Sequence, residues 1–154
     1  MAQEPDTSAR RMCFGCGDLN PQGLGVEFEV DGTKITGRFT ARKQHQGFPG
    51  VVHGGVAAAV MDEAMGWAMR ASGAWAMTAR MEVKYRKPLP LGEEVIVTAE
   101  VVRDRGKRLE AVSEIRTKSG ERITQSTGVF LRVPEELARQ YDLELIPDEQ
   151  PTPS

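Results

Sequence analysis

The sequence predicts an α+β fold in which an antiparallel sheet wraps around one long central helix. Strand-like alternation of apolar and polar residues flanks a single Ala- and Met-rich segment that begins at Gly54 and ends near Ser72. This helix is apolar around most of its circumference, which is typical of a buried helix. Its apolar positions are Val56, Ala57, Val60, Met61, Ala64, Met65, Trp67, Ala68 and Met69.

Local patterns predict the elements on both sides of this helix. Residues 26–40 indicate a hairpin, because the alternation continues on both sides of Asp31-Gly32, and residues 41–50 indicate a loop. After the helix, turn signals recur every ten or twelve residues as far as Pro134, which favours an antiparallel meander. The first of these strands places Met77, Ala79, Met81, Val83 and Tyr85 on one face.

The length of 154 residues fits one domain. We expect a flexible leader at 1–12, a folded domain at 13–133, and a short helix followed by an acidic tail at 134–154, with the tail disordered from Asp142 onward. The net charge of −2 gives no electrostatic reason to expect nucleic acid or an anionic membrane as partner. Without a secretory signal or an apolar run of about 20 residues, a cytoplasmic location is expected.

A second copy of the chain is also expected. One helix of about five turns cannot cover both faces of a strongly curved sheet. A homodimer would bury the remaining apolar surface.

Two cysteines, Cys13 and Cys16, have the Cys-x-x-Cys spacing of half a zinc site or of a redox pair. A complete zinc site needs about four ligands, and His45 and His53 are the only histidines. We therefore favour a turn-forming role, with a metal shared across an oligomer or a redox pair as the alternatives.

The start of the helix carries the candidate chemistry. Gly54 and Gly55 follow His53, and a helix N-terminus offers unpaired N–H groups and a positive dipole that suit an oxyanion. Asp62 lies two turns further on, beyond the reach of that dipole, and Glu63 points about 100° away from it. Gly54 and Asp62 are about 12 Å apart along the helix. One carbonyl group would therefore have to receive them from two different subunits.

Three ordered motifs, CFGCGDLNPQGLG, QGFPGVVHGGVAAAVMDEAMGWAM and KYRKPLPLGE, resemble the hotdog-fold acyl-CoA thioesterases of the phenylacetic-acid-pathway type over about residues 13–132. The resemblance implies the hotdog fold, dimers and often tetramers, and hydrolysis of an acyl-CoA to acid and CoA. It implies that the Gly54 amide polarises the thioester, and that Asp62 of the other subunit acts as nucleophile or general base.

The same resemblance suggests supporting roles. Thr78 matches a position that orients the attacking water. Where relatives carry an amide six residues before the His, this chain has Gly47, so Gln46 is the nearest candidate. His53 would orient the loop or contact the substrate carbonyl. The expected substrate-binding residues are Gly55, Phe48, Met65, Arg86 and Lys87, the last two within a basic patch that also includes Arg103, Arg105, Lys107 and Arg108.

No metal or redox cofactor is implied for this reaction. Two alternatives remain open: a hotdog dehydratase acting on 3-hydroxyacyl thioesters, and a non-catalytic module that binds acyl-CoA. The spacing from His53 to Asp62 favours the thioesterase pattern over the dehydratase.

Overall fold

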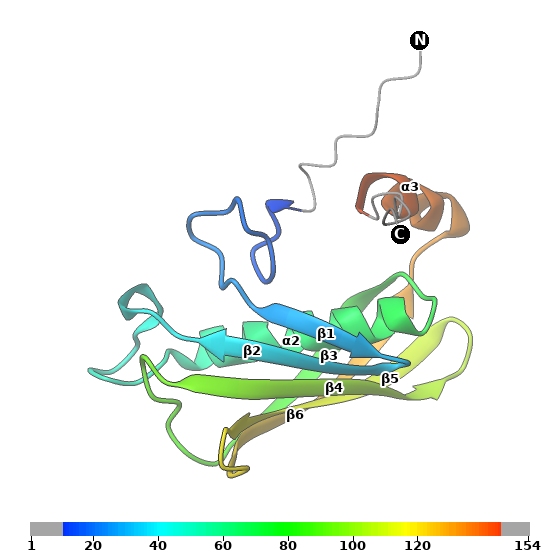
Figure 1. The fold of residues 1–154 in the computed structure, drawn as a ribbon. Coiled ribbons are helices and arrows are strands. Elements are labelled where there is room, and N and C mark those ends of the chain that lie inside the picture. Colours follow the sequence, from blue (N-terminus) through cyan, green and yellow to red (C-terminus); the bar gives the residue numbers. More distant parts are fainter. Residues whose placement is uncertain (1–10, 146–154) are drawn as a thin grey trace, which may run out of the picture.

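A computed structural model describes residues 11–145, which form six strands, two α-helices and one 3-10 turn. The long helix α2 lies along the concave side of a curved antiparallel sheet (Figure 1), which confirms the predicted α+β hotdog fold. No helix among these residues is long and apolar enough to cross a membrane. The elements are β1 (Glu27–Asp31), β2 (Lys34–Thr40), η1 (Lys43–His45), α2 (Gly54–Ala71), β3 (Ala76–Tyr85), β4 (Glu94–Asp104), β5 (Arg108–Thr117), β6 (Arg122–Arg132) and α3 (Glu135–Leu145).

The sheet has the strand order β1-β2-β4-β5-β6-β3, with every pair antiparallel. The predicted hairpin of β1 and β2 and the meander of β4, β5 and β6 are confirmed. In contrast, β3 pairs with β6 and not with the next strand along the chain. The connection from β3 to β4 contains Pro88 and Pro90 and crosses beneath the helix start, where Val51 bridges to Pro90. This places β3 at an open edge of the sheet.

A β-bulge changes the face that the start of β3 presents to α2. Thr78 pairs with Phe130 and Arg80 pairs with Val129, so Ala79 is the extra residue. The bulge puts Thr78 on the face that carries the buried side chain of Phe130, whereas Met77 pairs with the exposed Leu131 and is 53% exposed. The predicted alternation from Met77 to Tyr85 was therefore wrong at its first two positions. Bulges commonly re-aim a side chain in this way.

The core lies between the buried stripe of α2 and the inner face of the sheet. The buried residues of α2 recur every three or four positions, which is the spacing of an amphipathic helix packed on one side. Large core residues of the sheet include Ile35, Phe39, Leu109, Ile115 and Phe130, all at most 1% exposed. The buried helix residues are Ala57, Val60, Met61, Ala64, Met65, Ala68 and Met69.

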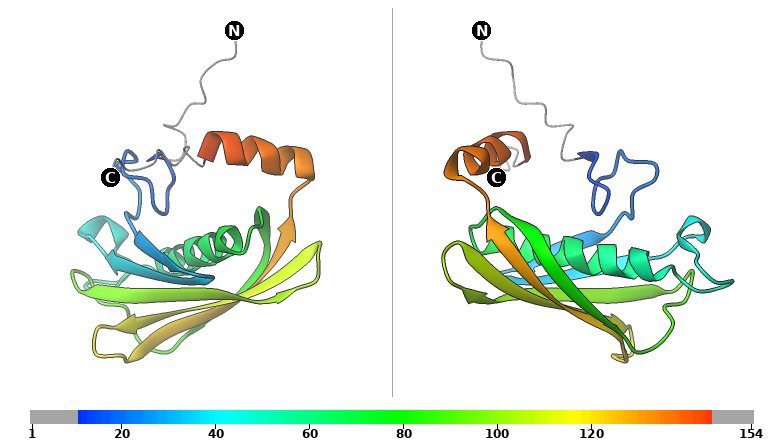
Figure 2. Two further views of the ribbon diagram at one scale, coloured as in Figure 1. Left: turned by 45° about the vertical axis from the view of Figure 1, so that its right-hand side comes forward. Right: turned by 180° about the vertical axis from the view of Figure 1, so that it is seen from behind.

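Residues 11–25 and α3 lie on the same side of the sheet as α2 (Figure 2). Helix α3 extends to Leu145, four residues into the segment expected to be a disordered tail. The extension has a tertiary cause, because the Trp75 indole donates a 2.6 Å hydrogen bond to Asp142 and packs edge-on against Tyr141. Most of the predicted leader and the tail beyond residue 145 lie outside the described residues.

Candidate active site

The first turn of α2 has one unused N–H group. His53 is the N-cap residue, and its Nδ1 accepts a 2.9 Å hydrogen bond from the Gly55 N–H. The N–H groups of Val56 and Ala57 both donate to the His53 carbonyl oxygen. Within residues 11–145, the Gly54 N–H donates to no acceptor. The cap therefore occupies the neighbouring donors and leaves the Gly54 amide for a ligand.

Tyr85 anchors the peptide unit that follows this N–H group. Its hydroxyl donates a 2.6 Å hydrogen bond to the Gly54 carbonyl oxygen. A Cβ at Gly54 would meet the Tyr85 ring at 3.5 Å, which is ordinary contact. The absence of a side chain at residue 54 is therefore not demanded by packing within the subunit.

Gly54 opens into a cavity of about 360 Å³ between the helix start and the β3–β4 connection. The cavity brings together Gly54, Phe48, Arg86 and Lys87, four of the residues singled out in the sequence, and it adds Tyr85 and Leu89. Phe48 is 83% exposed, so its ring stands at the mouth of the cavity with little support from its own subunit.

Gln46 holds the loop before the helix. Its Oε1 accepts a 3.1 Å hydrogen bond from the Gly50 N–H, and its backbone bridges to Val52. Gly50 has a φ of 78°, a conformation that favours glycine. In this structure Gln46 therefore shapes the loop, and it does not line the cavity that holds Gly54.

Asp62 is hydrogen-bonded to Thr78, a contact that the sequence analysis did not predict. Thr78 Oγ1 donates a 2.6 Å hydrogen bond to Asp62 Oδ1. Among the described residues, Asp62 Oδ2 accepts no hydrogen bond and keeps its lone pairs available. The bulge in β3 makes this contact, because it turns Thr78 toward α2.

Three other predicted residues have partners within the subunit. Met65 is fully buried against Gly128 and Ser126 of β6 and is not among the residues that line the Gly54 cavity. Lys87 is ion-paired with Glu121, and the Arg86 guanidinium donates to Gln125 Oε1 at 3.3 Å. The rest of the predicted basic patch lies around the β4–β5 turn, at the opposite end of the sheet.

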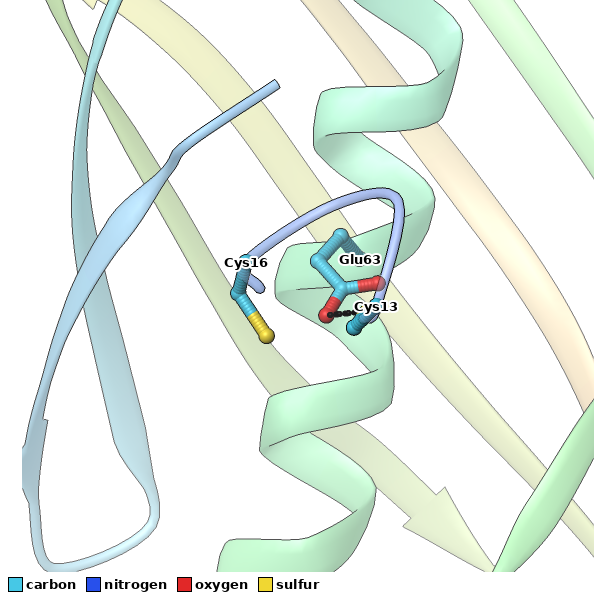
Figure 3. Close-up of side chains that lie close together, drawn as sticks. All are labelled: Cys13, Cys16 and Glu63. Carbon is cyan, nitrogen blue, oxygen red and sulfur yellow. Dashed lines mark hydrogen bonds between the residues drawn. The ribbon is translucent and has the colours of Figure 1, made fainter. Parts of the chain in front are cut away.

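The residue next to Asp62 belongs to a separate cluster. Glu63 points toward the turn at residues 13–17. Cys13 Sγ lies 3.3 Å from Glu63 Oε1, and Cys16 lies on the other side of the carboxylate (Figure 3). Burial raises the pKa of Glu63 to about 7, and a negative charge on Cys13 adds to the effect.

The two thiols of this cluster differ in acidity. A hydrogen bond from the Cys16 side chain lowers the pKa of Cys13 to about 5, and the backbone N–H groups of Cys16 and Gly15 contribute in the same direction. The pKa of Cys16 is raised, first because its thiol is the donor in that hydrogen bond and then because it is buried.

Sequence reasoning missed the roles of Tyr85 and Glu63. Tyr85 lies within the motif KYRKPLPLGE, but its partner is a backbone carbonyl, which no side-chain pattern indicates. Glu63 was set aside because it cannot face the same site as Asp62, and its contact with Cys13 spans fifty residues of sequence.

Comparisons with known proteins show the family of this chain. The model of the family described as the thioesterase superfamily matches residues 49–124. Mouse acyl-coenzyme A thioesterase THEM4 is 31% identical over 117 residues, which cover 73% of this chain and 50% of that protein. The chain spans about half the length of the curated relatives it matches.

Solved structures extend the likeness to the fold. A crystal structure of a thioesterase superfamily protein aligns with a TM-score of 0.75 at 28% identity, covering 84% of this chain and 70% of that one. The PaaI protein of the Escherichia coli phenylacetic acid degradation operon aligns with a TM-score of 0.68 at 20% identity, covering 72% and 81%. The chain belongs to the thioesterase superfamily, which confirms the family indicated by its motifs.

Proposed function

We propose that the protein hydrolyses acyl-CoA thioesters to a free acid and CoA, at sites that two copies of the chain share. The observation that carries the proposal is the pair of groups left available on α2: the Gly54 N–H at its start and Asp62 Oδ2 two turns later. The first suits an oxyanion, and the second suits a nucleophile or a general base. The substrate class follows the name of the THEM4 relatives.

The separation of these groups supports a shared site. Eight residues of helix correspond to a rise of about 12 Å, whereas groups that serve one carbonyl must each lie within about 3–4 Å of it. Gly54 and Asp62 of one chain therefore serve different substrates.

The exposed edge strand β3 supports a particular pairing of the two copies. Its outer edge is open over ten residues, and long exposed edges are normally covered in native proteins. Antiparallel pairing of β3 with its copy about a two-fold axis near Arg80 and Met81 sets Thr78 opposite Val83 of the partner subunit. Thr78 holds Asp62, and Tyr85, two residues beyond Val83, holds Gly54. The pairing thus brings Asp62 toward Gly54 of the partner subunit.

In the proposed reaction, the Gly54 N–H donates a hydrogen bond to the thioester oxygen and so stabilises the negative charge that develops there. Asp62 of the partner subunit, held by Thr78, either takes a proton from an attacking water or attacks the carbonyl carbon itself. In the first route, water adds to the carbon, the C–S bond breaks, and the CoA sulfur leaves with a proton. In the second, the C–S bond breaks as the Asp62 oxygen bonds to the carbonyl carbon, CoA leaves as the thiolate, and water then hydrolyses the acyl-enzyme anhydride to the free acid and the Asp62 carboxylate. No step of either route calls for a cofactor.

The cavity beside Gly54 suits the rest of the substrate. Phe48 and Leu89 present apolar surface, and Arg86 and Lys87 offer cations at its rim for the CoA phosphates. Met65 contributes to an acyl pocket only if the buried core opens, so its expected substrate contact stays a prediction. A cytoplasmic location and assembly of dimers into a tetramer stay predictions too.

Product analysis with purified protein tests the function. A panel of acyl-CoAs of different chain length, with 3-hydroxyacyl-CoAs included, is incubated with the full chain, and free thiol and enoyl product are both measured. A thioesterase releases CoA thiol, a dehydratase forms enoyl-CoA, and a binding module forms neither product while still retaining ligand. Binding without thiol release, or enoyl product alone, would overturn the proposal.

A further inference from the structure

The cluster of Cys13, Cys16 and Glu63 is not used by the proposed reaction, and Glu63 points about 100° away from Asp62 around α2. One ligand atom from each residue lies within 4.8 Å of the other two, and Cys13 Sγ is 3.3 Å from Glu63 Oε1. In the part of the chain that the structure describes, this is the one group of three or more such side chains. Figure 3 shows the turn that carries Cys13 and Cys16 lying over α2, with the two cysteines on either side of the Glu63 carboxylate.

These separations are close to those of a metal site. With Zn–S near 2.3 Å and Zn–O near 2.0–2.2 Å, tetrahedral ligands lie roughly 3.4–3.8 Å from one another. The three side chains need to move by less than a bond length to reach that geometry. The third ligand, which the Cys-x-x-Cys spacing could not supply, comes from α2 of the same chain. Neither histidine takes part, since His45 Nδ1 accepts from the Arg42 N–H and His53 caps α2.

The backbone holds the two cysteines in this arrangement. The Gly17 N–H donates to the Cys13 carbonyl oxygen at 2.9 Å, and the Val26 N–H donates to the Gly15 carbonyl oxygen at 3.0 Å. A Cβ at Gly15 would lie 2.4 Å from the Glu63 side chain, and one at Gly17 would lie 2.3 Å from the Arg11 carbonyl oxygen. The turn requires glycine at residue 17, because the clash there is with backbone, whereas a side chain at residue 15 would displace the Glu63 side chain.

The surroundings leave room for a fourth ligand. A cavity of about 340 Å³ adjoins the cluster and is lined by Gly66, Trp67, Arg70 and Trp75 in addition to the three residues. Two thiolates and one carboxylate around a divalent zinc ion carry a net charge of −1, and the Arg70 guanidinium in the same cavity provides a complementary charge.

We propose that Cys13, Cys16 and Glu63 bind one zinc ion, with solvent from this cavity as the fourth ligand. Binding displaces into solvent the proton of the Cys16 thiol and any proton still held by Cys13 or Glu63, and no bond is oxidised or reduced. The ion would hold the turn at residues 13–17 against α2 at Glu63, the residue next to Asp62. The ion would have a structural role. The sequence alone favoured a turn-forming role for the two cysteines, without a metal.

The test measures metal directly and needs no substrate. Full-length protein is reduced, stripped with a chelator and titrated with Zn²⁺ or Co²⁺, and bound metal is counted by elemental analysis. We expect one ion per chain, a thiolate-to-cobalt charge-transfer band, and a higher Tm with Zn²⁺. Glu63→Gln should weaken Zn²⁺ binding at least about tenfold, whereas Glu136→Gln, an exposed carboxylate on α3, should leave it unchanged.

Several results would overturn the proposal. They are less than one tenth of an equivalent of metal bound to the reduced protein, a cobalt spectrum without thiolate bands, or zinc binding that persists in Cys16→Ser. Oxidation to a Cys13–Cys16 disulfide in a protein that binds no metal would instead identify a redox pair. If the cysteine variants fail to fold, the wild-type cobalt spectrum and Glu63→Gln still decide the question.

Discussion

The Tyr85 hydroxyl donates a 2.6 Å hydrogen bond to the Gly54 carbonyl oxygen and so joins the last residue of β3 to the first residue of α2. Tyr85→Phe keeps the ring and removes this bond. We expect kcat to fall roughly tenfold, because the peptide unit that follows the Gly54 N–H loses its anchor, and stability to fall by about 0.5–1.5 kcal/mol. Tyr141→Phe, on α3, is the matched control. Equal thioesterase rates in Tyr85→Phe and wild type would show that this bond does not position the amide.

Gly54 allows a sharper change, because proline is tolerated at the first position of a helix, where its missing N–H has no helical partner. His53 has φ −55° and ψ 134°, a conformation compatible with a following proline. Gly54→Pro therefore deletes the proposed oxyanion donor while preserving the helix. We expect kcat to fall roughly 100- to 1,000-fold, with circular dichroism and Tm close to wild type. Gly54→Ala keeps the N–H and should lose much less; equal losses in both variants would assign the effect to bulk at this position.

Asp62 and Thr78 form the second half of the proposed site, joined by a 2.6 Å hydrogen bond. Asp62→Asn removes the nucleophile or base, and we expect kcat to fall by roughly two to four orders of magnitude with little loss of stability. Thr78→Val removes only the bond to Oδ1, so a loss of about tenfold is expected, and Thr78→Ser should restore most of it. Steady-state thiol release checks all three variants. An Asp62→Asn enzyme as fast as wild type would remove Asp62 from the mechanism.

The relation between Thr78 and Asp62 also shows how far the sequence leads. The motifs identified the family, whereas Asp62 was suggested by its place within the helix and Thr78 only by the family resemblance. The contact itself depends on the bulge at Ala79, which an alternating pattern does not reveal. The place of β3 beside β6 likewise depends on the crossing connection through Pro88 and Pro90. Local sequence patterns therefore could not predict the contacts that depend on the pairing and register of distant strands.

The same limit explains the cysteine cluster. The sequence alone indicated no third metal ligand beside Cys13 and Cys16. Glu63 comes close to them only because the turn at residues 13–17 folds back over α2. The prediction of a helix apolar on nearly all sides instead favoured a homodimer, and no segment of the same chain was expected to lie over α2.

An ion pair at the far end of the sheet predicts a pH effect on stability. Arg132 donates to Asp104 at 2.8 and 2.9 Å, and these hydrogen bonds lower the pKa of Asp104 to about 2, from an ordinary value of 3.8. A depressed folded-state pKa stabilises the fold above the ordinary value, and the effect is lost as the pH falls through about 2. Thermal unfolding should show Asp104→Asn less stable than wild type at pH 6 and nearly equal near pH 2. A constant Tm difference between these pH values would contradict the assignment.

Mixing two inactive variants tests whether the catalytic groups come from different subunits. In a shared site, a heterodimer of Gly54→Pro and Asp62→Asn subunits has one site with both defects and one site with neither. Random mixing makes about half of the dimers heterodimeric, so specific activity should recover to about a quarter of wild type after unfolding and refolding together. Each variant refolded alone is the control, and native mass measurement verifies that dimers form. If every site were built within one subunit, the mixture would stay as inactive as its components, even though each single variant had already established that both groups are needed.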